Sequence, residues 1–157
     1  MSASARKDLA KVVLLFVVAL MTAAMMITQP TMAKADTTNR VYDFRFSGNG
    51  ATQGSNYAYR KDTSSEAFLF IRVITMNSVN LYIDGGYSSI PSQSDWENCT
   101  RYGKAVASLA GYFLIHNSVN EDGYPYARLT GWATSGGGYI GGQWSPDTNE
   151  PWHTSLN

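Results

Sequence analysis

The sequence contains only one cysteine, Cys99, in 157 residues. No intramolecular disulfide can form, so a hydrophobic core must hold the fold without a covalent crosslink. There are only two histidines, His116 and His153, whereas a zinc site needs several His or Cys ligands at regular spacing. Acidic residues at 147–150 and 95–98 could bind calcium, but neither segment matches a defined calcium loop. We therefore expect no metal and no other cofactor.

The sequence also lacks a concentration of positive charge beyond its N-terminal segment. Leaving out residues 1–35 removes four basic and one acidic residue from totals of 12 and 12, so residues 36–157 carry a net charge of about −3. A protein that binds a phosphate backbone needs a basic patch, and none is present. Nucleic acid is therefore not an expected partner.

The first 35 residues have the pattern of a secretory signal peptide. Basic residues at positions 6, 7 and 11 precede an uncharged run of 22 residues, 12–33, and a small-x-small motif follows at Ala33–Ala35. We predict cleavage after Ala35, which leaves residues 36–157 as one secreted domain. The alternative is a leader that stays uncleaved and anchors the protein, because 22 uncharged residues can span a bilayer.

Residues 36–157 combine short alternating segments with glycine-rich turns and contain no long helical pattern. Residues 36–40 are expected to be a loosely held start. The predicted strands cover 41–47, 55–61, 67–75, 79–84 and 104–110, with 67–75 central because it is apolar on both sides. The alanines of 104–110 also allow a short helix there. Residues 48–54 are expected to be a loop, glycines 85–86 a turn, and residues 94–98 one helical turn. We predict an all-β domain, a single antiparallel β-sandwich or small barrel of about seven to eight strands.

Residues 112–144 form the most regular part of the chain. Three segments rich in aromatic and β-branched residues, joined by glycine-containing turns, predict a β-meander. Alternation directs Leu129, Phe113, Ile115, Ile140 and Trp144 inward. The opposite face would carry Tyr112 and His116, and it would also carry the predicted ligand-binding residues Tyr126, Arg128, Trp132, Tyr139 and Gln143. Flat aromatic rings beside planar polar groups are typical of sugar sites and of protein hot spots, although cross-strand aromatic pairs also stabilise sheets without any ligand.

Nucleophilic catalysis would require Ser or Cys beside a His base, and no serine lies in a G-x-S-x-G motif. A small secreted hydrolase remains an alternative. It would use either Cys99 with a histidine or two facing carboxylates. The simpler interpretation of Cys99 is a small, partly buried hydrophobic residue. We therefore predict no catalytic residue and no enzymatic activity.

Several short segments carry a resemblance to a known family. They are Val41-Tyr-Asp-Phe-Arg-Phe, Tyr57-Ala-Tyr-Arg-Lys, Ala127-Arg-Leu-Thr-Gly-Trp and Gly142-Gln-Trp-Ser-Pro-Asp, which follow the Ala-x-Ala leader. With these segments the chain resembles a family of small exported Gram-positive proteins of unknown function. A more distant similarity is to lactococcin-like bacteriocins, which share its size, leader type, aromatic content and lack of disulfides. The chain lacks the His-Gly and terminal aromatic motifs of those bacteriocins.

The leading functional hypothesis is a secreted, non-enzymatic protein that binds a cell-wall glycan or a protein partner at the envelope. The second is a bacteriocin-like antimicrobial protein, and the third is the small hydrolase. Contact with a membrane is expected only through an uncleaved leader. The ligand itself does not follow from the sequence.

Overall fold

The computed structural model describes residues 34–90 and 95–157. The predicted signal peptide therefore lies outside the described residues except for its last two positions. The strands, in chain order, are β1 Arg40–Phe46, β2 Thr52–Gly54, β3 Tyr59–Arg60, β4 Ala67–Ile74, β5 Val79–Gly86, β6 Glu97–Asn98, β7 Ala105–Ala107, β8 Gly111–Ile115, β9 Tyr126–Ala133, β10 Gly138–Ser145 and β11 Thr154–Ser155. One 3₁₀ turn, Arg101–Gly103, precedes β7.

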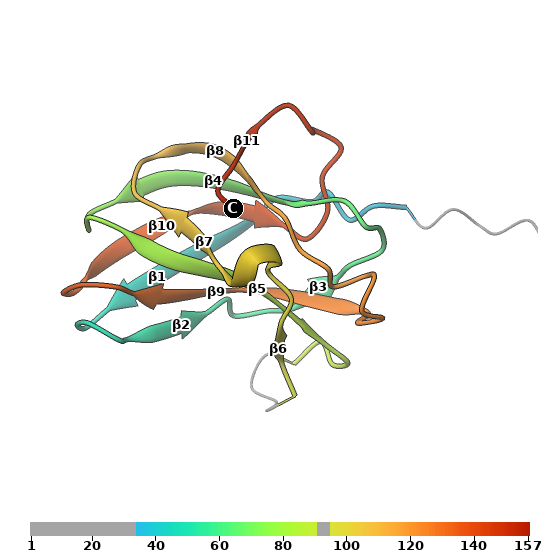
Figure 1. Ribbon diagram of the computed structural model, residues 1–157, viewed down its shortest axis with the longest axis horizontal. Helices are drawn as coiled ribbons and strands as arrows, with labels where there is room; N and C mark the ends of the chain where they lie inside the picture. Colours follow the sequence, from blue (N-terminus) through green and yellow to red (C-terminus); the bar gives the residue numbers. More distant parts are fainter. Residues whose placement is uncertain (1–33, 91–94) are drawn as a thin grey trace, which may run out of the picture. The chain divides into compact units, whose positions relative to one another are not determined.

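The first sheet, sheet A, has the strand order β1-β10-β4-β8-β11 (Figure 1). Its first four strands are antiparallel, and the short β11 runs parallel to β8 at one edge. β4 lies between β10 and β8, so the prediction of a central strand at 67–75 is confirmed. β10 shifts register against β4 between Gly141 and Gly142, which is a β-bulge.

The second sheet, sheet B, has the order β2-β9-β5-β6, with β3 also paired to β9 and β7 to β5. β5 and β9 are its long antiparallel strands, and they pair along their whole length from Val79↔Ala133 to Gly86↔Tyr126. Both sheets have free ends in their strand order, so the described residues form no closed barrel.

The two sheets share one hydrophobic core. Its sheet A residues include Phe44, Leu69 and Trp144, and its sheet B residues include Leu81 and Leu129. The sheets approach closely at Gly131, where an added Cβ would lie 2.9 Å from the rings of Phe44 and Phe46. The predicted all-β class is confirmed, and two sheets on a common core are what a β-sandwich requires.

Inward alternation was predicted correctly, whereas several boundaries were not. The inward side chains of residues 41–47 and 79–84 are buried as expected. However, β5 continues through both glycines of the expected turn at 85–86, and β2 lies within the expected loop at 48–54. The expected strand at 55–61 is only the two-residue β3, and residues 97–98 are a strand rather than a helical turn.

The predicted meander is also wrong. β8 and β10 belong to sheet A, whereas β9 between them belongs to sheet B. The chain therefore crosses from one sheet to the other and back within residues 112–144.

No helix within residues 34–90 and 95–157 is long and apolar enough to cross a membrane.

Candidate functional site

The five predicted ligand-binding residues lie on two opposite faces. Tyr126, Arg128 and Trp132 are on β9 and point away from the core on sheet B. Tyr139 and Gln143 are on β10 and point outward on sheet A. One continuous site containing all five residues is therefore excluded, because the core separates the two groups.

The outer face of sheet B is largely covered by its own side chains. The Arg128 guanidinium lies 4.7 Å from the centre of the Trp96 ring, and its Nε donates to Asp84 Oδ2 at 3.0 Å. Thr130 donates to the same oxygen at 2.7 Å. Asp84 is consequently only 7% exposed although it points away from the core. The Arg128 guanidinium is thus engaged with Asp84 and Trp96, which favours a structural role.

The outer face of sheet A is more open. The strand register places Val41, Gln143, Phe70 and Tyr112 side by side on β1, β10, β4 and β8. Val41 is 78% exposed and Tyr112 is 55% exposed, so large apolar groups are open to solvent at both ends of this row. Gln143, also exposed, lies between them and supplies an amide. We call these four residues the outer row.

Aromatic rings extend the outer row toward the C-terminal segment. The Tyr112 ring stacks on Phe70 with centroids 4.6 Å apart, and on its other side it stacks on His153 at 5.6 Å. Trp152 lies next to His153 with centroids 6.0 Å apart and is 72% exposed. The faces of Tyr112 are occupied by its neighbours, so Trp152 is the ring of this group that is most available to a ligand.

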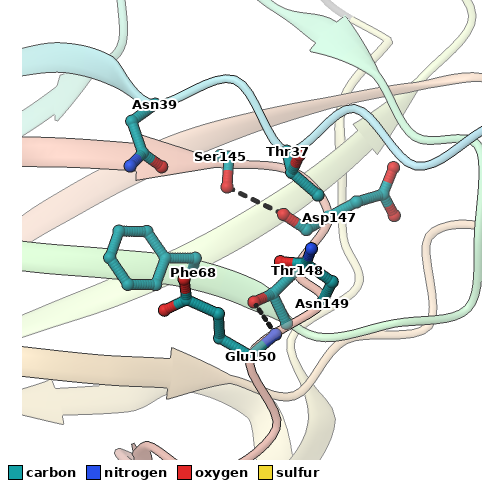
Figure 2. Close-up of a pocket in the computed structure, with 8 residues that line it drawn as sticks. All are labelled: Thr37, Asn39, Phe68, Ser145, Asp147, Thr148, Asn149 and Glu150. Carbon is teal, nitrogen blue, oxygen red and sulfur yellow. Dashed lines mark hydrogen bonds between the residues drawn. The ribbon is translucent and has the colours of Figure 1, made fainter.

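A polar pocket of about 170 Å³ lies beside the aromatic group (Figure 2). Its lining residues are Thr37, Asn39, Phe68, Ser145, Asp147, Thr148, Asn149 and Glu150. In Figure 2 the Phe68 ring lies between the Asn39 amide and the Glu150 carboxylate. His153 Nε2 is hydrogen-bonded to Glu150 Oε2 at 2.8 Å. The centre of the His153 ring lies 5.7 Å from that of the Phe68 ring. The pocket is therefore mainly polar, with amide, hydroxyl and carboxylate groups around the edge of one buried ring.

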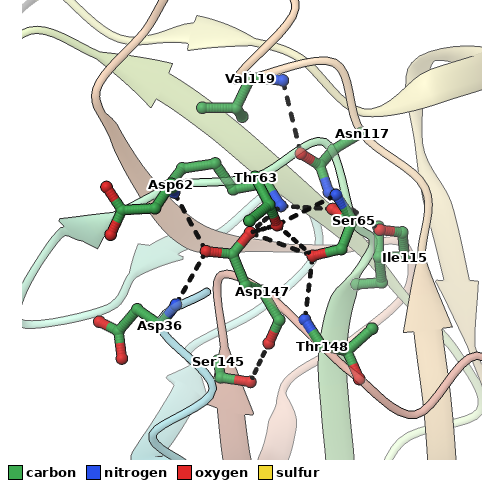
Figure 3. Close-up of polar contacts among 11 residues, drawn as sticks. Asp36, Asp62, Thr63, Ser65, Ile115, Asn117, Val119, Ser145, Asp147 and Thr148 are labelled. Carbon is green, nitrogen blue, oxygen red and sulfur yellow. Dashed lines mark hydrogen bonds and ion pairs between the residues drawn. The ribbon is translucent and has the colours of Figure 1, made fainter. Parts of the chain in front are cut away.

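Asp147 forms the buried polar centre behind this pocket (Figure 3). Its Oδ1 accepts hydrogen bonds from Lys61 Nζ at 2.7 Å, Thr63 at 2.7 Å and Ser65 at 3.1 Å. Its Oδ2 accepts from the backbone N–H groups of Asp36 and Asp62, both at 3.1 Å. We call these six residues the Asp147 cluster. It joins the N-terminal segment, the segment after β3 and the segment after β10.

Electrostatics favour a charged carboxylate in this cluster. Burial alone would raise the pKa of Asp147, but hydrogen bonds from Lys61 and Thr63 outweigh burial and hold that pKa below its ordinary value. Burial lowers the pKa of the Lys61 ammonium, and Asp147 opposes that change. With five donors on two oxygens, the Asp147 carboxylate has little remaining capacity for a ligand. Asp147 therefore positions the pocket wall rather than acting on a bound molecule.

The sequence offered little indication of the pocket. Asn39 was assigned to a loosely held start, yet the preceding Asp36 is bonded to Asp147 and to Arg40. Glu150 belongs to a proline-rich segment without periodicity, so no pattern could place it near Phe68. The available signal was the polar segment after β10, in which Asp147, Asn149 and Glu150 lie close together in the chain.

Neither a metal nor a reactive thiol is indicated. Within residues 34–90 and 95–157, no group of three His, Cys, Asp or Glu side chains is arranged to hold a metal ion. Cys99 is a buried free thiol, and burial raises its pKa to about 11. A thiol with that pKa stays protonated near neutral pH, and the nucleophile in cysteine catalysis is the thiolate. This counts against the hydrolase alternative based on Cys99.

Comparison with known proteins places the chain in a family. Residues 29–148 match the family described as "Protein of unknown function (DUF2712)", and the chain therefore belongs to it. The match includes β1 to β10 and the Asp147 cluster but ends before Glu150 and β11. No curated protein and no solved structure matched the chain.

Proposed function

We propose that this family member is an exported, non-enzymatic binding protein that attaches to a glycan of the cell envelope through the outer face of sheet A. Export is supported by the basic, apolar and small-x-small pattern of residues 1–35. The resemblance described above supports a Gram-positive source, and envelope attachment is inferred from the exposed side chains on the outer face of sheet A. The predicted face on β9 is replaced by the outer row, Trp152 and the adjacent pocket.

The observation that carries this proposal is the polar pocket close to the exposed ring of Trp152. Sugar rings have apolar faces and polar rims, so they bind where an aromatic ring adjoins planar hydrogen-bonding groups. Trp152 provides an exposed ring, and Asn39, Asn149 and Glu150 provide donors and acceptors, whereas Phe68 is buried in the pocket wall. The volume of about 170 Å³ is below that of a typical drug-sized site and fits one small polar unit. A chain of such units would continue along the outer row.

Retention on purified cell wall tests the proposal. Residues 36–157 are incubated with wall material, and the bound fraction is compared for the wild type, Trp152→Ala and an Asn39→Ala/Asn149→Ala double variant. All three positions are exposed, so we expect unchanged unfolding midpoints and at least about a tenfold loss of affinity, which corresponds to 1.4 kcal/mol. The matched control is Trp132→Ala on sheet B, which should bind like the wild type.

Two further treatments separate a glycan from a protein partner. Protease-treated wall should retain the protein, and soluble fragments from enzymatic digestion of the wall should compete for it. Equal retention of the wild type and both pocket variants would contradict the assignment of the site. Loss of binding after protease treatment would contradict the glycan.

A further inference from the structure

We propose that cleavage between Ala35 and Asp36 creates an N-terminus whose α-ammonium group binds the buried carboxylate of Asp147. Processing would thereby lock the start of the secreted chain onto its C-terminal segment. This inference rests on the export part of the proposed function and is independent of glycan binding.

Three groups of Asp36, its backbone nitrogen, its carbonyl and its carboxylate, form hydrogen bonds to other residues. Its backbone nitrogen lies 3.1 Å from Asp147 Oδ2, and its carbonyl oxygen accepts from the Asp147 N–H at 3.4 Å. Its carboxylate accepts hydrogen bonds from both terminal nitrogens of Arg40, at 3.1 and 2.8 Å. Within residues 34–90 and 95–157, Asp36 is the first residue that bonds to the rest of the fold, whereas Lys34 is exposed. Anchoring thus begins at the first residue after the small-x-small motif.

The chemistry of cleavage changes the group that faces Asp147. A signal peptidase hydrolyses the Ala35–Asp36 amide with one water molecule: the C–N bond breaks, the hydroxyl goes to the Ala35 carbonyl carbon, and the Asp36 nitrogen leaves as an amine. That amine takes up a proton near neutral pH, because an α-amino group has a pKa of about 8. A neutral donor with one N–H becomes a cation with three. Hydrogen bonds to a carboxylate are stronger from a charged donor.

The Asp147 cluster can accommodate this second cation. Lys61 bonds to Oδ1 and the Asp36 nitrogen bonds to Oδ2, so the new ammonium does not have to displace Lys61. Two carboxylates, those of Asp36 and Asp147, then face three cations, namely Lys61, Arg40 and the α-ammonium. Both carboxylates are largely shielded from water, with side-chain exposures of 20% and 0%, so screening of the pair is limited.

A comparison of defined N-termini tests the proposal. One protein begins at Asp36 and another at Ala35, each released from a fusion by a protease that leaves no extra residue. Urea unfolding should give the Asp36 protein a folding equilibrium constant about fivefold to tenfold larger, the difference expected between a charged and a neutral donor. In an Asp147→Asn background the two proteins should be equally stable. Asp43→Asn, which removes an exposed acid on β1, should preserve the difference.

A second measurement avoids dependence on the Asp147→Asn variant. The reaction rate of the α-amine with a limiting amine-specific reagent is measured in the folded and in the urea-unfolded protein. Folding should slow the reaction at least about tenfold for the Asp36 protein and much less for the Ala35 protein. Equal stability of the two proteins, an advantage that persists in Asp147→Asn, or an unprotected α-amine would each overturn the inference. No glycan is present in these assays, so their outcome is separate from that of wall binding.

Discussion

Among single residues, Lys61 and Asp147 are the least expected in a core, because both side chains are fully buried. Buried ions are costly to dehydrate, and such a pair persists only when its remaining bonds are satisfied. Here hydroxyls and backbone N–H groups complete the set. Removing one partner would leave the other charge buried and unpaired.

The first prediction concerns that pair. Lys61→Met should lower the free energy of unfolding by about 3–5 kcal/mol, because Asp147 loses its buried cation. The double variant Lys61→Met/Asp147→Leu should cost less than the sum of the single changes, measured by urea denaturation. Arg60→Met is the control, since that side chain is 68% exposed and should change stability by no more than about 0.5 kcal/mol. Equal effects at positions 60 and 61 would contradict this account.

The second prediction is a dependence on pH. The pKa of Asp147 is lower in the folded than in the unfolded state, so the unfolded chain binds its proton more readily. The stability that Asp147 contributes should be fully present above about pH 5 and should decline as the pH falls through and below the ordinary carboxyl range. Urea titrations of the wild type and Asp147→Asn should show a gap that closes on acidification. A gap that stays constant down to about pH 2 would be the opposite result.

At the scale of elements, β10 determines how sheet A is built. It pairs with β1 on one side and β4 on the other, and its bulge at Gly141–Gly142 adjusts the register. Gly142 lies so close to the backbone carbonyl of Phe70 that no Cβ fits there. Gly142 is therefore required by the approach of β4.

The third prediction follows from that approach. Gly142→Ala should cost about 3 kcal/mol or more, because a rigid backbone group and not a flexible side chain must move. Gly48→Ala is the control, since nothing lies within 4 Å of an added Cβ there, and it should be close to neutral. Thermal unfolding of both variants distinguishes them. Similar melting temperatures for the two would mean that β4 and β10 are farther apart than described.

The strands also show which parts of the fold could be predicted from the sequence. Alternation placed Leu129, Ile140 and Trp144 in the core correctly, because neighbouring side chains of a strand point to opposite faces. Alternation does not reveal which strand lies next to which. Residues 116–125 join β8 to β9 and carry the chain to the other sheet, whereas a meander would have required adjacent strands. Residues 134–137 then return the chain to sheet A, and this second crossing divides the five predicted binding residues between β9 and β10.

The pocket could not be predicted for a related reason. Asn39, Phe68 and Glu150 are far apart in the chain and meet because β1, β4 and the segment after β10 converge. Their positions depend on the Asp147 cluster, whose members are individually ordinary polar residues of turns. Long-range pairing of this kind leaves no local periodicity.

At the scale of the whole molecule, the two ends of the described chain depend on each other. Asp36 bonds to Asp147, and β11 pairs with β8 at the edge of sheet A. The final residues add Trp152 and Glu150 to the candidate site, whereas the family match ends at residue 148. The last nine residues therefore contribute both to the candidate site and, through β11 and Leu156, to the edge of sheet A and its core.

The fourth prediction compares two C-terminal deletions. Removing residues 149–157 should preserve cooperative unfolding with a loss of about 1–3 kcal/mol, and it should abolish retention on cell wall. Removing residues 138–157 should leave the chain unfolded, because β1 and β4 lose their shared partner. Circular dichroism and hydrogen exchange report both outcomes. A cooperatively folded protein without β10 would contradict the described topology.

The place of β10 in sheet A also has a consequence for biosynthesis. A polypeptide leaves the ribosome from its N-terminus, so β1 and β4 are synthesised long before the strand that joins them. Neither can complete its pairing until almost all 157 residues have been made. Sheet A therefore stays incomplete through most of translation, and the sandwich cannot close over its core until β10 has been made.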